Sequence, residues 1–190
     1  KWTMIASLSS MHSTTGLLGN GGHAPPGFTY WADYLDLQAE GPVAWREEIR
    51  NGIQSCAKMV CFIDGEYLRS FNCLQEVAYA FNENKPIVPV IMDQEAWGLL
   101  TNARGAEEVL SDPSCQLMQF AGKPIIEGQC FDEDVLRALY WQLSAINFCP
   151  CRDEDIGSMG TVEVVRNLRT YIAKDIPYLK EHAELDRYAS

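Results

Sequence analysis

Residues 59–92 read MVCFIDGEYLRSFNCLQEVAYAFNENKPIVPVIM. The stretch opens with five consecutive apolar residues, a length and composition typical of a strand that is buried on both faces. A second apolar run, residues 87–92, predicts another such strand. Between the two runs, apolar residues recur at steps of three and four and predict an amphipathic helix: Leu74, Val77, Ala78 and Phe81. A strand, a helix and a strand in short succession indicate a βαβ unit, and therefore a parallel sheet.

The same alternation continues on both sides of this stretch. Upstream, residues 3–8 and 28–31 predict strands, and Pro42 opens a helix whose apolar residues are four apart. Downstream, residues 93–114 predict helical pieces, a last short strand is expected within residues 117–126, and an acidic start followed by apolar positions to Ile146 predicts a strongly amphipathic helix. We therefore expect an α/β fold, a flavodoxin-like doubly wound parallel sheet of about five strands with helices on both faces.

The chain divides into one domain and an appendage. Residues 1–147 hold the predicted alternation, residues 148–160 are polar enough to be a linker, and residues 161–190 predict a C-terminal helical tail that is broken near Pro177. The tail is therefore expected to be an appendage to the α/β domain.

Two places depart from a simple doubly wound pattern. Residues 9–27 are rich in glycine and proline and can hold at most a short helix between the first two strands. Pro89 lies inside a predicted strand, where it removes one backbone donor, so we expect a bulge or a strand edge at that position.

Composition excludes several classes of function. A formal net charge of −11 disfavours a broad surface for nucleic-acid phosphates, and no apolar run reaches the length of a membrane-spanning helix. The seven cysteines show no paired zinc-ribbon spacing, and the three histidines are scattered, so reduced thiols and no metal site are expected. We expect a cytoplasmic protein without a resident cofactor.

The stretch from Gly52 to Asp93 resembles the central part of a TIR domain, a family named for the Toll and interleukin-1 receptors. The resemblance rests on an apolar strand, an S-x-x-C-x-x-E pattern that opens a helix, and a following I-V-P-V-I strand. Residues 28–33 resemble the second TIR strand with its acidic end, and residues 37–41 resemble the loop after it. An acidic residue and Trp97 follow the I-V-P-V-I strand, as in NAD-cleaving members of the family.

The resemblance implies a set of site residues. Glu76 matches the glutamate that NAD-cleaving TIR domains require. The substrate-binding residues that the resemblance implies are Ser9, Ser10, Asp33, Glu40, Ser70, Cys73 and Trp97. It also implies NAD+ as a substrate and a homo-oligomer formed through TIR–TIR contacts.

One carboxylate suffices for this chemistry. Nicotinamide leaves NAD+ as a neutral molecule, so no general acid is needed, and a carboxylate near the ribose stabilises the oxocarbenium-like transition state. Water as the attacking group gives ADP-ribose, and the substrate's own adenine gives a cyclic product.

Plainer interpretations stay open. Glu76 near a helix start also complements the helix dipole, and Trp97 also suits packing. The main alternative function is a TIR module that signals by self-association without catalysis. A receiver-like domain is a weaker alternative, because Asp64 follows a strand but residues 3–10 lack the acidic cluster that receivers need.

Overall fold

A computed structural model describes residues 2–7, 29–32 and 42–152, together with tail residues 154, 155, 157, 160, 163, 166, 167, 170 and 171. Five strands form the main sheet: β1 (Trp2–Ser7), β2 (Thr29–Ala32), β3 (Lys58–Ile63), β4 (Ile87–Ile91) and β7 (Cys149–Pro150). Their order across the sheet is β2-β1-β3-β4-β7. This is the order of flavodoxin-like folds, so the expected α/β fold class is confirmed.

One strand departs from the expected parallel arrangement. β3 runs parallel to β4, and β4 runs parallel to β7. β1 lies antiparallel to both β2 and β3, so it alone among these five strands runs the other way. An antiparallel pair needs no crossover helix in its connection, which fits the glycine- and proline-rich sequence between β1 and β2.

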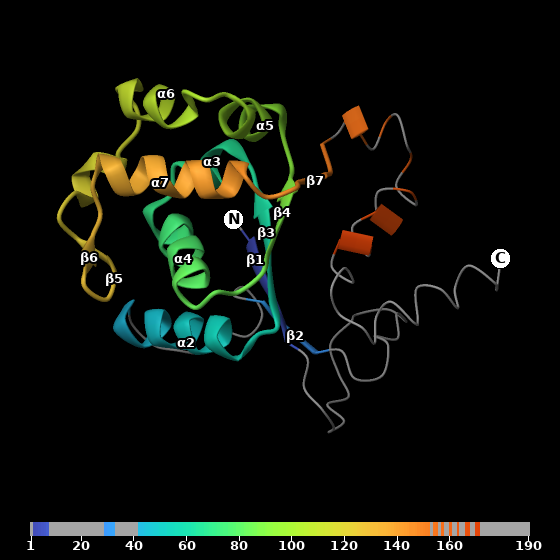
Figure 1. The fold of residues 1–190 in the computed structure, drawn as a ribbon, viewed down its shortest axis with the longest axis horizontal. Coiled ribbons are helices and arrows are strands. Elements are labelled where there is room, and N and C mark those ends of the chain that lie inside the picture. The colour runs from blue at the N-terminus through green and yellow to red at the C-terminus, as the bar shows by residue number, and fades with distance from the viewer. Residues whose placement is uncertain are drawn as a thin grey trace.

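The labelled helices lie on one side of this sheet (Figure 1). They are α2 (Pro42–Ser55), α3 (Gly65–Leu68), α4 (Phe71–Asn82), α5 (Gln94–Thr101), α6 (Gly105–Ser111) and α7 (Glu133–Ser144). Three of them begin with an aspartate whose carboxylate accepts a hydrogen bond from the amide three residues further on, which stabilises the first turn. These N-caps are Asp64, Asp93 and Asp132.

The short strand expected within residues 117–126 forms, but outside the main sheet. A 3₁₀ turn, η1 (Leu117–Phe120), precedes β5 (Pro124–Ile126), which pairs with β6 (Gln129–Cys130) in a separate hairpin. The fifth strand of the main sheet is instead β7, within the segment expected to be a linker. Two residues contain no apolar run, so the sequence pattern carried no signal for β7.

Side chains of β3 alternate between two apolar clusters. Met59, Cys61 and Ile63 face the helices and belong to the larger core, while Val60 faces the other side with Val88, Val90 and Cys149. Tyr171, a helical residue of the tail, packs against this second cluster. Through Tyr171, the tail therefore helps to bury the face of the sheet that carries Val60.

Pro89 meets its sequence expectation. On the β3 side, Pro89 pairs in register with Cys61. On the other side, β7 pairs with β4 only at Val90 and Ile91. β7 thus starts one residue beyond the proline. Among the described strands, Pro89 therefore lies at a local edge, where its missing N–H costs no sheet hydrogen bond.

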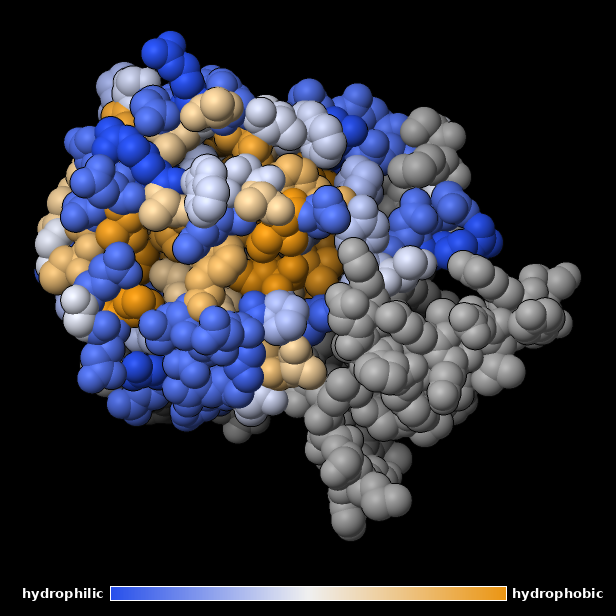
Figure 2. Space-filling model, in the orientation of Figure 1, coloured by the Kyte–Doolittle hydropathy of each residue, from blue (hydrophilic) through white to orange (hydrophobic). Residues whose placement is uncertain are grey.

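Hydrophilic residues cover α2 on the face seen in Figure 2, whereas apolar residues are visible between α2 and α7. Within the described residues, none of the helices is long and apolar enough to cross a membrane.

The buried Gln75 ties the β5–β6 hairpin to α4. Its side-chain amide donates to the carbonyls of Pro124 and Ile125, both at 3.1 Å.

Replacing Gln75 with leucine removes that donor, and we expect a loss of about 1–3 kcal/mol in the free energy of unfolding. Urea denaturation measures this loss. The control is Gln119→Leu on the exposed side of η1, which should change stability little; equal effects of the two substitutions would contradict the anchoring role.

Candidate functional site

Cys73 and Glu76 lie three residues apart on α4, and hence on the same face of the helix. Both are buried, and only 6% of Glu76 is exposed. Ser70 is the N-cap of this helix, and its carbonyl accepts a hydrogen bond from the Leu74 amide at 3.0 Å. Three of the predicted site residues therefore share the first two turns of α4.

Glu76 lies close to the middle of β3. Burial raises the pKa of the Cys61 thiol to about 12, and the negative charge of Glu76 contributes to the rise together with Cys73 and Cys56. The interaction of the thiol with the Tyr67 hydroxyl lowers its pKa and so acts in the opposite direction. The Glu76 carboxylate thus belongs to an interior cluster between α4 and the sheet.

The thiol of Cys61 is chemically inert near neutral pH. A pKa of about 12 keeps it protonated, and the thiolate is the nucleophilic form of cysteine. Of the ionisable groups in this cluster, Glu76 is the one for which the resemblance to TIR domains implies a role in bond cleavage.

The carboxyl ends of β3 and β4 are joined by Asp93. One oxygen of its carboxylate accepts from the Gly65 amide at 3.1 Å, and the other accepts from the Ala96 amide at 2.7 Å. The backbone adds a further link, since the Met92 amide donates to the Ile63 carbonyl at 2.9 Å. This edge, where open α/β sheets bind ligands, is therefore held rigidly.

Arg69 joins the start of α4 to α5. Its guanidinium donates to the Gly65 carbonyl at 3.0 Å and forms an ion pair with Glu95 at 2.7 Å. Asp112 lies 3.7 Å from the same guanidinium. Because Arg69 immediately precedes the N-cap of α4 and Glu95 is two residues before Trp97, this contact fixes α5 against the helix that carries Glu76.

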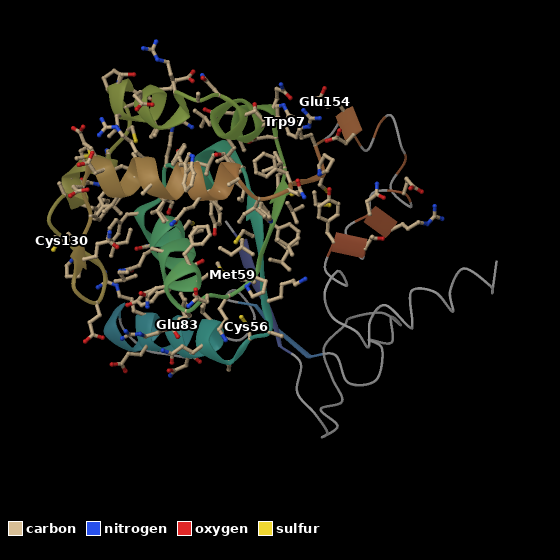
Figure 3. The ribbon with its side chains drawn as sticks, in the orientation of Figure 1. Cys56, Met59, Glu83, Trp97, Cys130 and Glu154 are labelled. Atoms are coloured by element: carbon tan, nitrogen blue, oxygen red, sulfur yellow. The ribbon has the colours of Figure 1, made fainter. Side chains whose placement is uncertain are left out.

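Trp97 lies on α5 with one ring face covered. The guanidinium carbon of Arg152 is 4.4 Å from the centre of the Trp97 ring, within the range of a cation–π contact. Phe148 meets the same indole edge-on, with ring centroids 6.0 Å apart. Figure 3 shows Trp97 and Glu154 at one end of the sheet, opposite Cys56 and Met59.

Arg152 is the residue of this region that the sequence analysis did not single out. It forms two hydrogen bonds to the carboxylate of Asp155, at 2.8 and 2.9 Å, and a third to the side-chain oxygen of Gln94, at 2.7 Å. The only local signal is an aspartate three residues after an arginine. The contact with Trp97 depends on β7 bringing Arg152 beside α5, and β7 itself was not predicted.

Four predicted site residues lie outside the described part of the chain: Ser9, Ser10, Asp33 and Glu40. The strand before the two serines is described, and its reversed direction places Ala6 opposite Lys58, where β3 begins. β1 therefore ends at the edge of the sheet opposite to Asp93.

Metal binding finds no support in the described residues, where no group of three or more His, Cys, Asp or Glu side chains is placed to hold a metal ion.

The family model described as "TIR domain" matches residues 24–109, which include the strands β2, β3 and β4 and the helices from α2 through α5 into α6, but not β1. Residues 24–109 belong to a TIR domain. Glu76, Ser70, Cys73 and Trp97 all lie within the matched part of the TIR domain, whereas Arg152 and β7 follow it. No curated protein and no solved structure matches the chain.

The interior cluster of the TIR domain can be tested by alkylation. Iodoacetamide should modify the exposed Cys130 in the native protein, and leave Cys61 unmodified even at about pH 9, because Cys61 is fully buried and its pKa is about 12. Peptide mass spectrometry measures both sites. Protein unfolded in urea is the control, since both thiols should then react. Modification of native Cys61 at a rate near that of Cys130 would show that the cluster is open.

Proposed function

We propose that this TIR domain cleaves the nicotinamide–ribose bond of NAD+, releasing nicotinamide and either ADP-ribose or a cyclic ADP-ribose product. The observation that carries the proposal is Glu76: within a TIR domain, the glutamate of S-x-x-C-x-x-E lies on the face of α4 that is turned to β3. TIR domains are signalling modules, and their family includes NAD-cleaving members. The proposed setting is cytoplasmic signalling in immunity or cell death.

The chemistry requires little of the protein beyond charge and position. The bond between nicotinamide and ribose breaks with its electron pair passing to the pyridinium nitrogen, so nicotinamide departs neutral. Positive charge develops on the ribose, and the Glu76 carboxylate stabilises it electrostatically. That stabilisation is strongest where water is excluded, as it is around a side chain only 6% exposed.

The same burial imposes a condition on the reaction. A ribose cannot contact a carboxylate that is shielded by its own helix and sheet, so α4 must move relative to its neighbours before substrate binds. We propose that self-association produces this movement. Of the four predicted residues outside the described part of the chain, Asp33 follows β2 and Glu40 belongs to the following loop, which are the segments expected to complete such a site. Ser9 and Ser10 instead follow β1, which ends at the opposite edge of the sheet.

A substitution at Glu76 tests the proposal. In the charge-neutral, similarly shaped Glu76→Gln variant, nicotinamide release should fall by a factor of roughly 10² or more, the typical cost of removing one electrostatic group from a transition state. Chromatographic quantification of nicotinamide is the measurement. Glu83→Gln, the same change at the C-terminal end of the same helix, is the control and should retain activity.

Protein concentration should be varied in the same assay. Specific activity that rises steeply with concentration supports a site formed by assembly. Wild-type protein that releases no nicotinamide even when assembled, or a Glu76→Gln variant as active as wild type, would refute the enzymatic proposal.

A non-enzymatic signalling module is the second candidate, and two observations favour it. Glu76 is nearly inaccessible, and one face of the Trp97 ring is already covered by Arg152. Such a module would assemble equally with and without NAD+. Light scattering in both conditions separates this candidate from the enzyme.

A further inference from the structure

The contact between Trp97 and Arg152 excludes a flat ligand from one face of the indole. With the guanidinium carbon 4.4 Å from the ring centre, a nicotinamide or adenine ring cannot stack on that face at the same time. Arg152 and an aromatic ligand are therefore competitors for one surface.

Arg152 is held in this position by several partners. The Asp155 carboxylate accepts from both the Nε and an Nη atom of the guanidinium, and it also accepts from the Arg152 backbone amide at 3.0 Å. Gln94, at the first turn of α5, and Glu154, at 3.3 Å, contact another Nη atom. Only 16% of the Arg152 side chain and 13% of the Asp155 side chain are exposed. Bidentate pairs of this kind fix orientation as well as charge.

The chain contacts the main sheet both before and after Arg152. Immediately before it, β7 pairs with β4, and the Cys151 amide donates to the Ile91 carbonyl at 2.9 Å. Further along, Tyr171 packs against the apolar cluster on the far face of the sheet. The segment can therefore hold the guanidinium over Trp97 without being part of the helical layer that contains Glu76.

We propose that Arg152 and Asp155 form an autoinhibitory latch, in which the Arg152 guanidinium keeps the nicotinamide or adenine ring of a nucleotide from stacking on the face of Trp97 that it covers. The proposal rests on the proposed function for the identity of the nucleotide. Binding then requires the latch to open, so the observed affinity equals the affinity of the open state reduced by the fraction of molecules that are open. Weakening the latch should therefore tighten binding, an effect opposite to that expected from losing a substrate-binding arginine.

Binding of NAD+ to protein carrying Glu76→Gln tests the latch without turnover. Adding Arg152→Ala should lower the dissociation constant for NAD+, measured by calorimetry, at least about fivefold. Asp155→Asn removes the anchor but keeps the guanidinium, and should give a smaller decrease. Should Arg152→Ala fail to fold, Asp155→Asn alone gives the answer. Thermal unfolding establishes which variants are folded.

Two further variants make the result specific. Arg166→Ala makes the same change in charge at an exposed tail residue that is paired with Glu163, and should leave the dissociation constant unchanged. Combining Arg152→Ala with Trp97→Ala should abolish the gain in NAD+ affinity, because the indole face that Arg152→Ala uncovers is then missing. This double-mutant cycle attributes the change in affinity to the contact between Arg152 and Trp97.

The outcomes separate the two proposals. An unchanged or weaker affinity in both Arg152→Ala and Asp155→Asn overturns the latch, whether or not the wild type cleaves NAD+. Wild-type protein that binds NAD+ without cleaving it, even when assembled, overturns the enzymatic proposal, and the latch is then decided by the affinities. Failure of every folded variant to bind NAD+ overturns both.

Discussion

Burial of β3 on both faces is the constraint on which the rest of the structure depends. A strand with apolar residues on both sides is stable only if both sides are covered. The helices cover the side of Met59, Cys61 and Ile63, and the side of Val60 is covered with a contribution from Tyr171. The backbone N–H and C=O groups of β3 also need hydrogen-bond partners, and the neighbouring strands β1 and β4 provide them. Every candidate site residue that the structure describes follows β3 in the chain and takes its position from this central strand.

The burial of α4 links the fold to the question of function. This helix packs against α2, α7 and the β5–β6 hairpin, and its buried residues therefore extend around much of its circumference. A glutamate on such a helix must have compensating interactions, since an isolated interior charge is costly. The burial of this carboxyl group also means that the proposed site is closed in the structure. In the proposed function, catalysis and signalling by assembly are two aspects of one rearrangement, since the contact that joins two domains also exposes the carboxylate.

How much of this could be predicted depended on whether the signal was local. The limits of β3 and β4 follow from their apolar runs, and sequence analysis located them within about one residue. The apolar spacing from Leu74 to Phe81 located the body of α4 but not its first turn. The direction of β1 has no such signal, because an apolar strand pairs equally well in either sense and its partners decide. β7 is too short for a pattern. In the site, the position of Glu76 on its helix followed from a resemblance, but its burial depends on how α4 packs against the sheet. Arg152 could not be paired with Trp97, because 55 residues and an unpredicted strand separate them in the chain.

Asp93 illustrates how narrow the choice of side chain can be at the edge of such a sheet. Its two carboxylate oxygens accept from the amides of Gly65 and Ala96, so the first turns of two helices share one side chain. Asparagine, the nearest isostere, has one oxygen and one NH2 group, and in either orientation a donor would face one of those two amides. Position 93 thus accepts asparagine as an ordinary helix cap but not as the link between helices. A homologue with asparagine there would need a different connection between its third and fourth strands, and this single position could serve to divide the domain's relatives into structural subgroups.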